Sequence, residues 1–232
     1  MEELKKIISA KNSRFKARLF KDFSAKDLKS AAHASLKLEI PDIEILTLIK
    51  HELECKKKES REDLIPSLLD KLNKDLKENK VRPIGWLNRA RKALQLLQNP
   101  PLTVYNPSHS VYVILMDYWE EDATYGVYVG ETRLLVEDRF QQHINGIHPG
   151  LGVQNRGIQL LRSLMLYAPK KITPRQRLFY ESAVHHCLTI VRGTLGEDGR
   201  ALRVKGNGKN KKPEEWPQNF QLSLRERLSE EA

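Results

Sequence analysis

Two polar side chains, an arginine and a histidine, stand four residues apart in the second half of this 232-residue chain. Arg139 and His143 fall on one face of a predicted helix, because residues at i and i+4 are neighbours on a helix surface. The apolar positions Val136, Phe140 and Ile144 follow one residue on, about 100° around the helix, and predict its buried side. Arginine offers a planar fork of donors that matches phosphate oxygens. A solvated arginine and a surface histidine would fit the same spacing.

A carboxylate, Glu181, interrupts the apolar stripe of a second predicted helix. Thr173 is the expected cap of this helix, and a proline follows in its first turn. Carboxylate oxygens suit hard divalent cations such as Mg²⁺, so Glu181 is a candidate metal ligand. The alternative is an ion pair at the rim of the core, with Arg175 or Arg177 as partner. The residue pattern leaves both interpretations open.

The elements that must position these side chains form a small region of strands and helices. Residues 110–116 and 125–130 are rich in β-branched and aromatic residues and predict two strands. The polar turn 120–124 between them predicts an antiparallel hairpin. Four glycines and a proline predict a loop over 146–157, and residues 163–167 suit a third strand. The predicted helices run from about 134 to 145 and from 173 to 188.

Each strand of the hairpin carries a tyrosine-bearing triplet, Ser110-Val111-Tyr112 and Tyr128-Val129-Gly130. Arg139 follows Tyr128 by eleven residues, and His143 lies four residues further on. Glu181 comes later, on the helix that follows. In order and spacing this set resembles the GIY-YIG nuclease family, whose members carry Gly-Ile-Tyr and Tyr-Ile-Gly triplets at these places. The resemblance spans about residues 108–195.

The resemblance implies metal-dependent hydrolysis of a nucleic-acid phosphodiester. Glu181 would hold Mg²⁺ or Mn²⁺, and Arg139 would contact the non-bridging phosphate oxygens. Tyr112 or Tyr128 would activate the attacking water, with Arg139 and the metal lowering a phenol pKa that is otherwise about 10. His143 would relay a proton or hydrogen-bond a tyrosine. Which tyrosine acts as the base stays open.

A glycine-rich basic segment, 192–212, suits the phosphate backbone of DNA, because glycine frees backbone amides and the basic side chains supply charge. Its predicted nucleic-acid contacts are Arg192, Arg200, Arg203, Lys205, Asn207 and Lys209. Asn207 is also the candidate for the asparagine that closes the family pattern. The same composition suits a disordered basic loop.

The first hundred residues predict helices only. Amphipathic segments are expected around 2–22, 41–57 and 84–97, with Ser24 as the cap of a short helix. Leucines at helical spacing predict a further helix at Leu68, Leu69, Leu72 and Leu76. Prolines 100 and 101 end the helical run.

We therefore expect an α+β chain. A helical region over residues 1–100 would serve as a DNA-binding, dimerisation or scaffold element. Residues 101–212 would form the catalytic domain, a three-stranded antiparallel sheet flanked by helices. Residues 213–232 would form a C-terminal amphipathic helix.

Composition sets limits on the class of protein. The two cysteines, Cys55 and Cys187, exclude a disulfide framework or a four-cysteine zinc site. Zinc binding by His185, His186 and Cys187 is disfavoured, since adjacent helix residues point about 100° apart. No segment reaches the roughly 20 apolar residues of a membrane-spanning helix. The N-terminus lacks the apolar core of a signal peptide, which predicts a cytoplasmic protein.

The positive charge is concentrated rather than uniform. The net charge is +10 for the chain, +8 for residues 1–100, −5 for 101–150, +10 for 151–212 and −3 for 213–232. Basic regions thus flank a centre that is not itself basic. This distribution favours a nucleic-acid partner.

These observations predict an endonuclease of the restriction or defence type that cuts double-stranded DNA. A homodimer would suit a palindromic site. One alternative is a repair or structure-specific nuclease that acts on branched or single-stranded DNA. Another is a nucleic-acid-binding protein without activity, suggested by Glu131, where several family members carry lysine, and by the unplaced closing asparagine.

Overall fold

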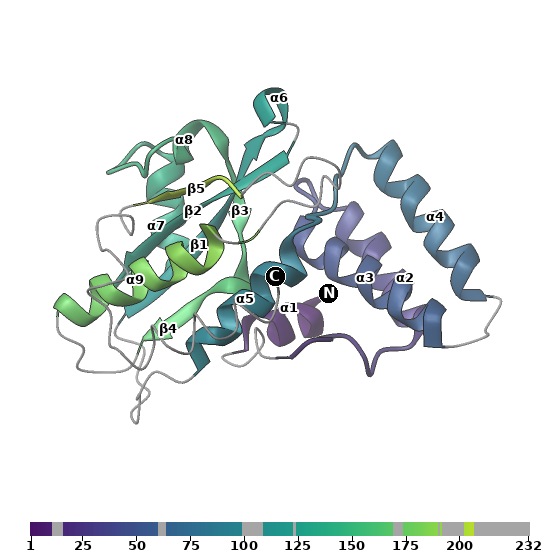
Figure 1. Cartoon of the computed structure of the whole chain (residues 1–232). Coiled ribbons are helices and arrows are strands. Elements are labelled where there is room, and N and C mark those ends of the chain that lie inside the picture. Colours follow the sequence, from purple (N-terminus) through teal and green to yellow (C-terminus); the bar gives the residue numbers. More distant parts are fainter. Residues whose placement is uncertain are drawn as a thin grey trace. The chain divides into compact units, whose positions relative to one another are not determined.

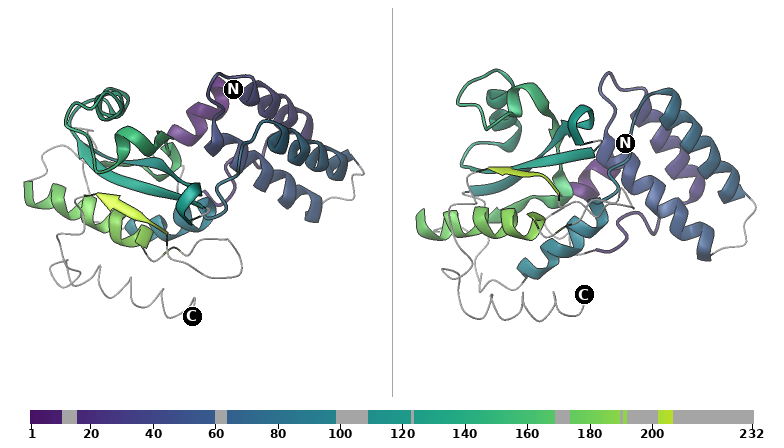
Figure 2. Two further views of the ribbon diagram at one scale, coloured as in Figure 1. Left: turned by 90° about the horizontal axis from the view of Figure 1, so that it is seen from above. Right: turned by 45° about the horizontal axis from the view of Figure 1, so that its top comes forward.

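The structure of the chain is a computed structural model, shown in Figures 1 and 2. The residues that it describes are 1–10, 16–59, 64–98, 109–122, 124–168, 174–189, 191 and 202–206. Within these residues, no helix combines the length and apolar character needed to cross a membrane. The chain divides into two compact units, Met1–Leu87 and Asn88–Ala232.

The first unit is helical, as its leucine spacing predicts. Its helices are α1 (Glu2–Ser9), α2 (Ala25–Leu36), α3 (Ile43–Glu59) and α4 (Leu64–Glu78). The prediction for Ser24 is confirmed, since its side chain accepts a hydrogen bond from the Asp27 amide at 3.1 Å. The helix expected over 2–22 is shorter, because Ala10 is extended and ends α1. The apolar stripes of α2, α3 and α4 pack against one another.

The buried Glu52 carboxylate of this helical unit has basic partners. Glu52 of α3 is 1% exposed, and Arg18 donates to both of its carboxylate oxygens, at 2.5 and 3.1 Å. Arg18 also pairs with Glu59. Lys56 donates to the Lys21 carbonyl at 2.9 Å and approaches Glu52. These contacts satisfy a carboxylate that would otherwise be costly to bury.

The second unit begins at a helix, before the proline pair where the sequence suggested a boundary. Helix α5 (Leu87–Leu94) continues into the 3-10 helix η2 (Gln95–Gln98). The 3-10 helix η2 contacts α9 (Pro174–Thr189) of the same unit. This contact explains why α5 and η2 group with the sheet that follows them in the sequence.

The predicted hairpin forms the centre of the second unit. Strands β1 (His109–Tyr118) and β2 (Thr124–Thr132) pair antiparallel from Ser110 opposite Thr132 to Tyr118 opposite Thr124. The connection is a short helical turn, α6 (Trp119–Asp122). Both strands are buried on both faces over most of their length.

The α+β class is confirmed, but the expected three-stranded antiparallel sheet is wrong. The sheet is mixed and five-stranded, in the order β3-β1-β2-β5, with β4 also pairing β1. The three further strands are β3 (Gly157–Leu160), β4 (Leu166–Ala168) and β5 (Val204–Gly206). The third strand expected over 163–167 forms only in part. The 3-10 turn η3 (Arg162–Leu164) takes up its first residues and separates β4 from β3, and both of these strands pair with β1.

Two other differences have local causes. Within the expected loop 146–157, residues Val153–Arg156 form the short helix α8, which begins after Gly152 in a left-handed conformation. Within the expected basic loop, β5 adds to β2 in parallel, and the Val127 amide donates to the Arg203 carbonyl at 2.9 Å. The predicted C-terminal helix, 213–232, lies outside the described residues.

Helices cover both faces of this sheet (Figures 1 and 2). Helix α7 (Val136–Ile144) and α8 lie on one face, where Val136, Phe140 and Val153 pack against alternate residues of β1. Helix α9, lime green in the figures, lies on the other face and contacts β1, β2, β4 and β5. Cys187 of α9 is fully buried. The site residues therefore come from both helical layers.

Candidate active site

The two triplet tyrosines lie on the same face of the sheet. Tyr112 of β1 is opposite Gly130, and Tyr128 of β2 is opposite Ile114, so side-chain alternation directs both rings towards α7. Their ring centroids are 6.3 Å apart. Tyr112 is 1% exposed and Tyr128 6% exposed. The phenols therefore sit in the core rather than on the surface.

Helix α7 adds His143 to this pair. The ring of His143 lies 5.8 Å from the Tyr112 ring and 5.5 Å from the Tyr128 ring, centroid to centroid. Its Nε2 atom is 2.6 Å from the Tyr112 hydroxyl oxygen, and its Nδ1 atom accepts from the Gly150 amide at 2.7 Å. Burial and the Arg139 charge lower the pKa of His143 to about 4. The surface-histidine interpretation is therefore wrong, and the imidazole is neutral near neutral pH.

Two glycines allow the rings to come this close. A Cβ at Gly130 would lie 2.4 Å from the Tyr112 hydroxyl oxygen. A Cβ at Gly150 would lie 2.5 Å from the Tyr128 ring. The backbone thus fills the space beside each phenol, which leaves no room for a side chain.

Arg139 is the half-buried member of the cluster, one turn before His143 on α7. Its guanidinium donates to Gln142 Oε1 at 3.0 Å and to the His148 carbonyl at 3.3 Å. These two contacts hold the side chain beside the tyrosines. A hydrogen bond from Arg139 and its positive charge both act to lower the pKa of Tyr112.

The expectation that neighbouring cations bring a tyrosine pKa down towards working pH is not met by the protein residues alone. Burial has the largest effect and raises the pKa of both phenols. Arg139 opposes this rise at both tyrosines, and for Tyr128 a hydrogen bond from Tyr112 adds a smaller lowering. Desolvation wins because the phenolate loses more hydration on burial than one arginine restores.

Glu181 reaches the same centre electrostatically from α9. Its side chain is buried, at 3% exposure, and its negative charge raises the pKa of both Tyr112 and Tyr128. Among the described residues, no group of three or more histidine, cysteine, aspartate or glutamate side chains could hold a metal ion. One carboxylate nevertheless fits Mg²⁺, which binds through one or two carboxylates and takes its other ligands from water and phosphate.

Two of the six predicted nucleic-acid contacts lie within the described residues. Arg192, Arg200, Asn207 and Lys209 lie outside the described residues. Arg203 directly precedes β5. Lys205 lies within this strand, opposite Tyr128 of β2. The guanidinium of Arg203 stacks on the Tyr118 ring and donates to Glu121 at 2.7 Å. It is therefore engaged within the protein.

Gly150 is the residue of this site that the sequence did not single out. The only signal was its place in a glycine-rich loop directly after a proline, which predicts a turn but no partner. Its role emerges only once the loop 146–152 folds back on α7 and places the amide against the imidazole.

Comparison of the chain with protein-family models, curated proteins and solved structures finds no match.

Proposed function

We propose that this chain is a metal-dependent endonuclease that hydrolyses phosphodiester bonds in double-stranded DNA, in a restriction or defence role. The observation that supports this most is the convergence of Tyr112, Tyr128, Arg139 and His143 within one buried cluster. These residues are separated in the sequence and come from two strands and a helix. Glu181 adds a carboxylate charge from a further helix.

Tyr112 is the better placed of the two tyrosines to act as the base. Its oxygen lies 2.6 Å from His143 Nε2, and the nearby Arg139 guanidinium acts to lower the pKa of its phenol. Groups that donate to a phenolate stabilise it relative to the phenol. In the proposed reaction, the Tyr112 proton is first released to solvent, and the phenolate then takes a proton from water as that water attacks phosphorus. The bond to the 3′ oxygen breaks, and this oxygen is protonated by water.

Arg139 and Glu181 would deal with the charge on the phosphate. The arginine, at the boundary of the buried cluster, can present its donors to non-bridging oxygens once they displace its contacts with Gln142 and His148. Glu181 would hold Mg²⁺ or Mn²⁺. When bound, the metal supplies a Lewis acid that offsets negative charge on phosphate and leaving-group oxygens.

A cleavage assay with supercoiled plasmid tests the proposal. We expect nicking or linearisation with Mg²⁺, none with EDTA, and a loss of at least about 100-fold in Glu181→Gln, the scale on which a catalytic group contributes. The matched control is Glu137→Gln on α7, which removes the same charge from an exposed ion pair with Arg162. That variant should cleave like the unmodified chain.

Other results would point to the alternatives. Cleavage of branched or single-stranded DNA without cutting of duplex plasmid would replace the restriction role with a structure-specific one. DNA binding without cleavage of any substrate would contradict the nuclease proposal and favour a binding protein. Glu131 does not argue for that outcome, since alternation along β2 directs it away from the tyrosine face.

A further inference from the structure

The two nitrogens of the buried His143 ring have partners of different kinds. A backbone amide can only donate, so the 2.7 Å contact from the Gly150 amide requires an unprotonated Nδ1. The other nitrogen, Nε2, faces the Tyr112 hydroxyl oxygen, which can donate or accept. The amide is therefore the partner that decides where the ring proton lies.

We propose that residues 146–152 form a positioning loop whose Gly150 amide fixes His143 as the Nε2-protonated tautomer. The Nε2–H group then donates to the Tyr112 oxygen at 2.6 Å. Since the Nε2 lone pair is not available, His143 does not accept the Tyr112 proton. Gly150 is a positioning residue, and it acts through His143.

Several contacts hold the loop against the helix so that the amide stays in place. The Ile147 amide donates to the Gln142 carbonyl at 2.8 Å, and Arg139 donates to the His148 carbonyl at 3.3 Å. Both Gly146 and His148 have positive φ, 75° and 47°, which turns the chain sharply back after α7. A left-handed histidine is uncommon and is sustained here by these surrounding contacts.

Gly150 also packs closely against the Tyr128 ring. Its Cα approaches the Tyr128 ring so closely that an added Cβ would lie 2.5 Å from a ring carbon. The same residue therefore packs on one tyrosine and, through His143, orients the other. This dual contact fixes the imidazole relative to both phenols.

The consequence for the reaction rests on the proposed function. If Tyr112 is the base, a neutral Nε2–H donor stabilises the phenolate oxygen and keeps its own proton throughout. A histidine with the opposite tautomer would instead accept the phenol proton. A donor at this place can be replaced by another side chain with an N–H group, whereas a proton acceptor cannot.

Nuclear magnetic resonance of the full chain tests the tautomer directly, without metal or DNA. In ¹⁵N-labelled protein, two-bond proton–nitrogen correlations distinguish the tautomers, and the signals missing in His143→Gln assign the ring. We expect protonation at Nε2 only. Protonation at Nδ1, or at both nitrogens near neutral pH, would overturn the proposal.

The role of Gly150 is tested with a matched pair of variants. Gly150→Ala and Gly150→Pro both add a Cβ beside Tyr128, but only proline removes the amide proton. The Tyr128 ring must shift in both variants, so the difference between them reports on the amide, and we expect a stronger preference for the Nε2-protonated tautomer in Gly150→Ala than in Gly150→Pro. An unchanged tautomer in folded Gly150→Pro would overturn the role of the amide. If Gly150→Pro does not fold, the tautomer measured in the unmodified chain and the cleavage by the His143 variants described below still test the proposal.

Cleavage by His143 variants separates a donor from a base. Glutamine presents an N–H donor near the place of Nε2 but cannot take up a proton. For a donor, His143→Gln should stay within about tenfold of the unmodified chain, and His143→Ala should lose about 100-fold or more. Equal losses in both would overturn the donor role. An unmodified chain without any nuclease activity would contradict the proposed function alone, since the resonance result stands without it.

Discussion

The hydrogen bond between Tyr112 and His143 joins two buried side chains. Removing one partner therefore leaves the polar atom of the other buried and unsatisfied, whereas removing both leaves neither of these two atoms unsatisfied. We expect Tyr112→Phe to lower the free energy of unfolding by about 1–3 kcal/mol. His143→Leu should lose more, because it also leaves the Gly150 amide without its acceptor, and the double variant should lose less than the sum of the two single losses. Urea unfolding of the unmodified chain, the two single variants and the double variant gives the coupling free energy between the two side chains. Strictly additive losses would contradict this hydrogen bond.

The same histidine makes stability depend on pH. Its folded pKa of about 4 lies below its ordinary value of 6.5, so between these values the unfolded chain binds a proton that the folded chain does not. Stability must then fall as pH drops from 6.5 towards 4, by about 3 kcal/mol for this shift. His143→Gln should flatten the profile between pH 6.5 and 5. Unfolding curves across this range check it, and identical slopes in both proteins would rule out the shift.

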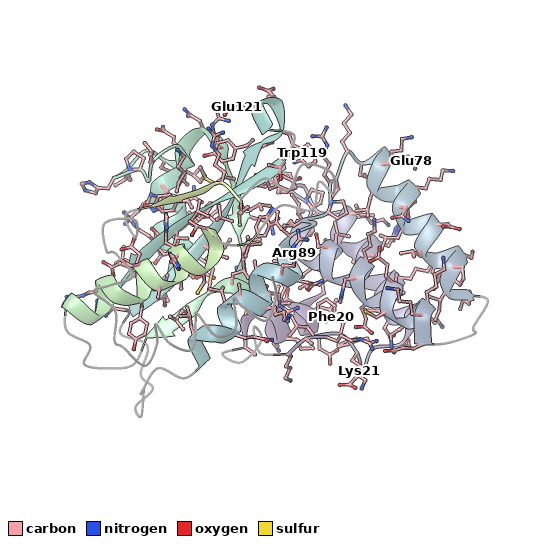
Figure 3. All side chains as sticks on the ribbon, in the orientation of Figure 1. Phe20, Lys21, Glu78, Arg89, Trp119 and Glu121 are labelled. Carbon is pink, nitrogen blue, oxygen red and sulfur yellow. The ribbon has the colours of Figure 1, made fainter. Side chains whose placement is uncertain are left out.

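At the scale of elements, the Tyr118 ring, at the turn end of the hairpin, contacts side chains from two other segments. The guanidinium groups of Arg156 on α8 and of Arg203 beside β5 lie 4.9 and 4.4 Å from the centroid of the Tyr118 ring. Both arginines also pair with Glu121 on α6, a residue labelled in Figure 3. Their contacts bring α6, α8 and β5 together at the end of β1.

This arrangement predicts which part of the sheet loosens when it is broken. Cation–π contacts and exposed ion pairs are each worth about 0.5–1 kcal/mol. In Tyr118→Ala, we expect hydrogen exchange of the Val127 amide, which bonds the Arg203 carbonyl, to accelerate about tenfold. The Leu161 amide, bonded to Val113 at the opposite edge, should change little. Equal acceleration at both amides would indicate a general loss of stability instead.

Local patterns predicted the hairpin, α7 and α9 well, because each has a strong period and a clear start or end. The sheet order was not predictable in the same way. Strand β5 is three residues long and lies in a glycine-rich basic stretch, and only its neighbour β2 makes it a strand. Likewise, the charge of Arg203 suggested contact with DNA, but its partners are Tyr118 and Glu121, at the turn of the hairpin. These residues are about 80 positions away in the sequence, so no local pattern indicated the contact.

Within the candidate site, spacing predicted which residues belong together but not their electrostatics. Arg139 and His143 were placed on one helix face, yet the depth of burial that makes the imidazole neutral depends on Tyr112 and Gly150 from other segments. The same burial raises the tyrosine pKa values, which sequence reasoning expected to fall.

At the scale of the whole molecule, the net charge of +10 governs how the chain would meet DNA. Binding should weaken with salt because contacts to phosphates release counterions, each with a slope of about −0.9 in log K against log salt. We expect affinity for duplex DNA to fall more than about tenfold between about 50 and 200 mM NaCl. Titrations of labelled duplex check this, and a salt-independent affinity would remove the electrostatic argument for a nucleic-acid partner.

Cys187 gives the molecule a built-in reporter of motion. Burial raises the pKa of this thiol to about 12, and only the thiolate reacts with alkylating reagents. The thiol is fully buried on the same helix as Glu181, so it reacts only when this part of α9 becomes exposed. In a Cys55→Ser background, the alkylation rate would therefore count the openings that expose the carboxylate. A comparison with and without DNA would show whether added DNA slows or accelerates these openings.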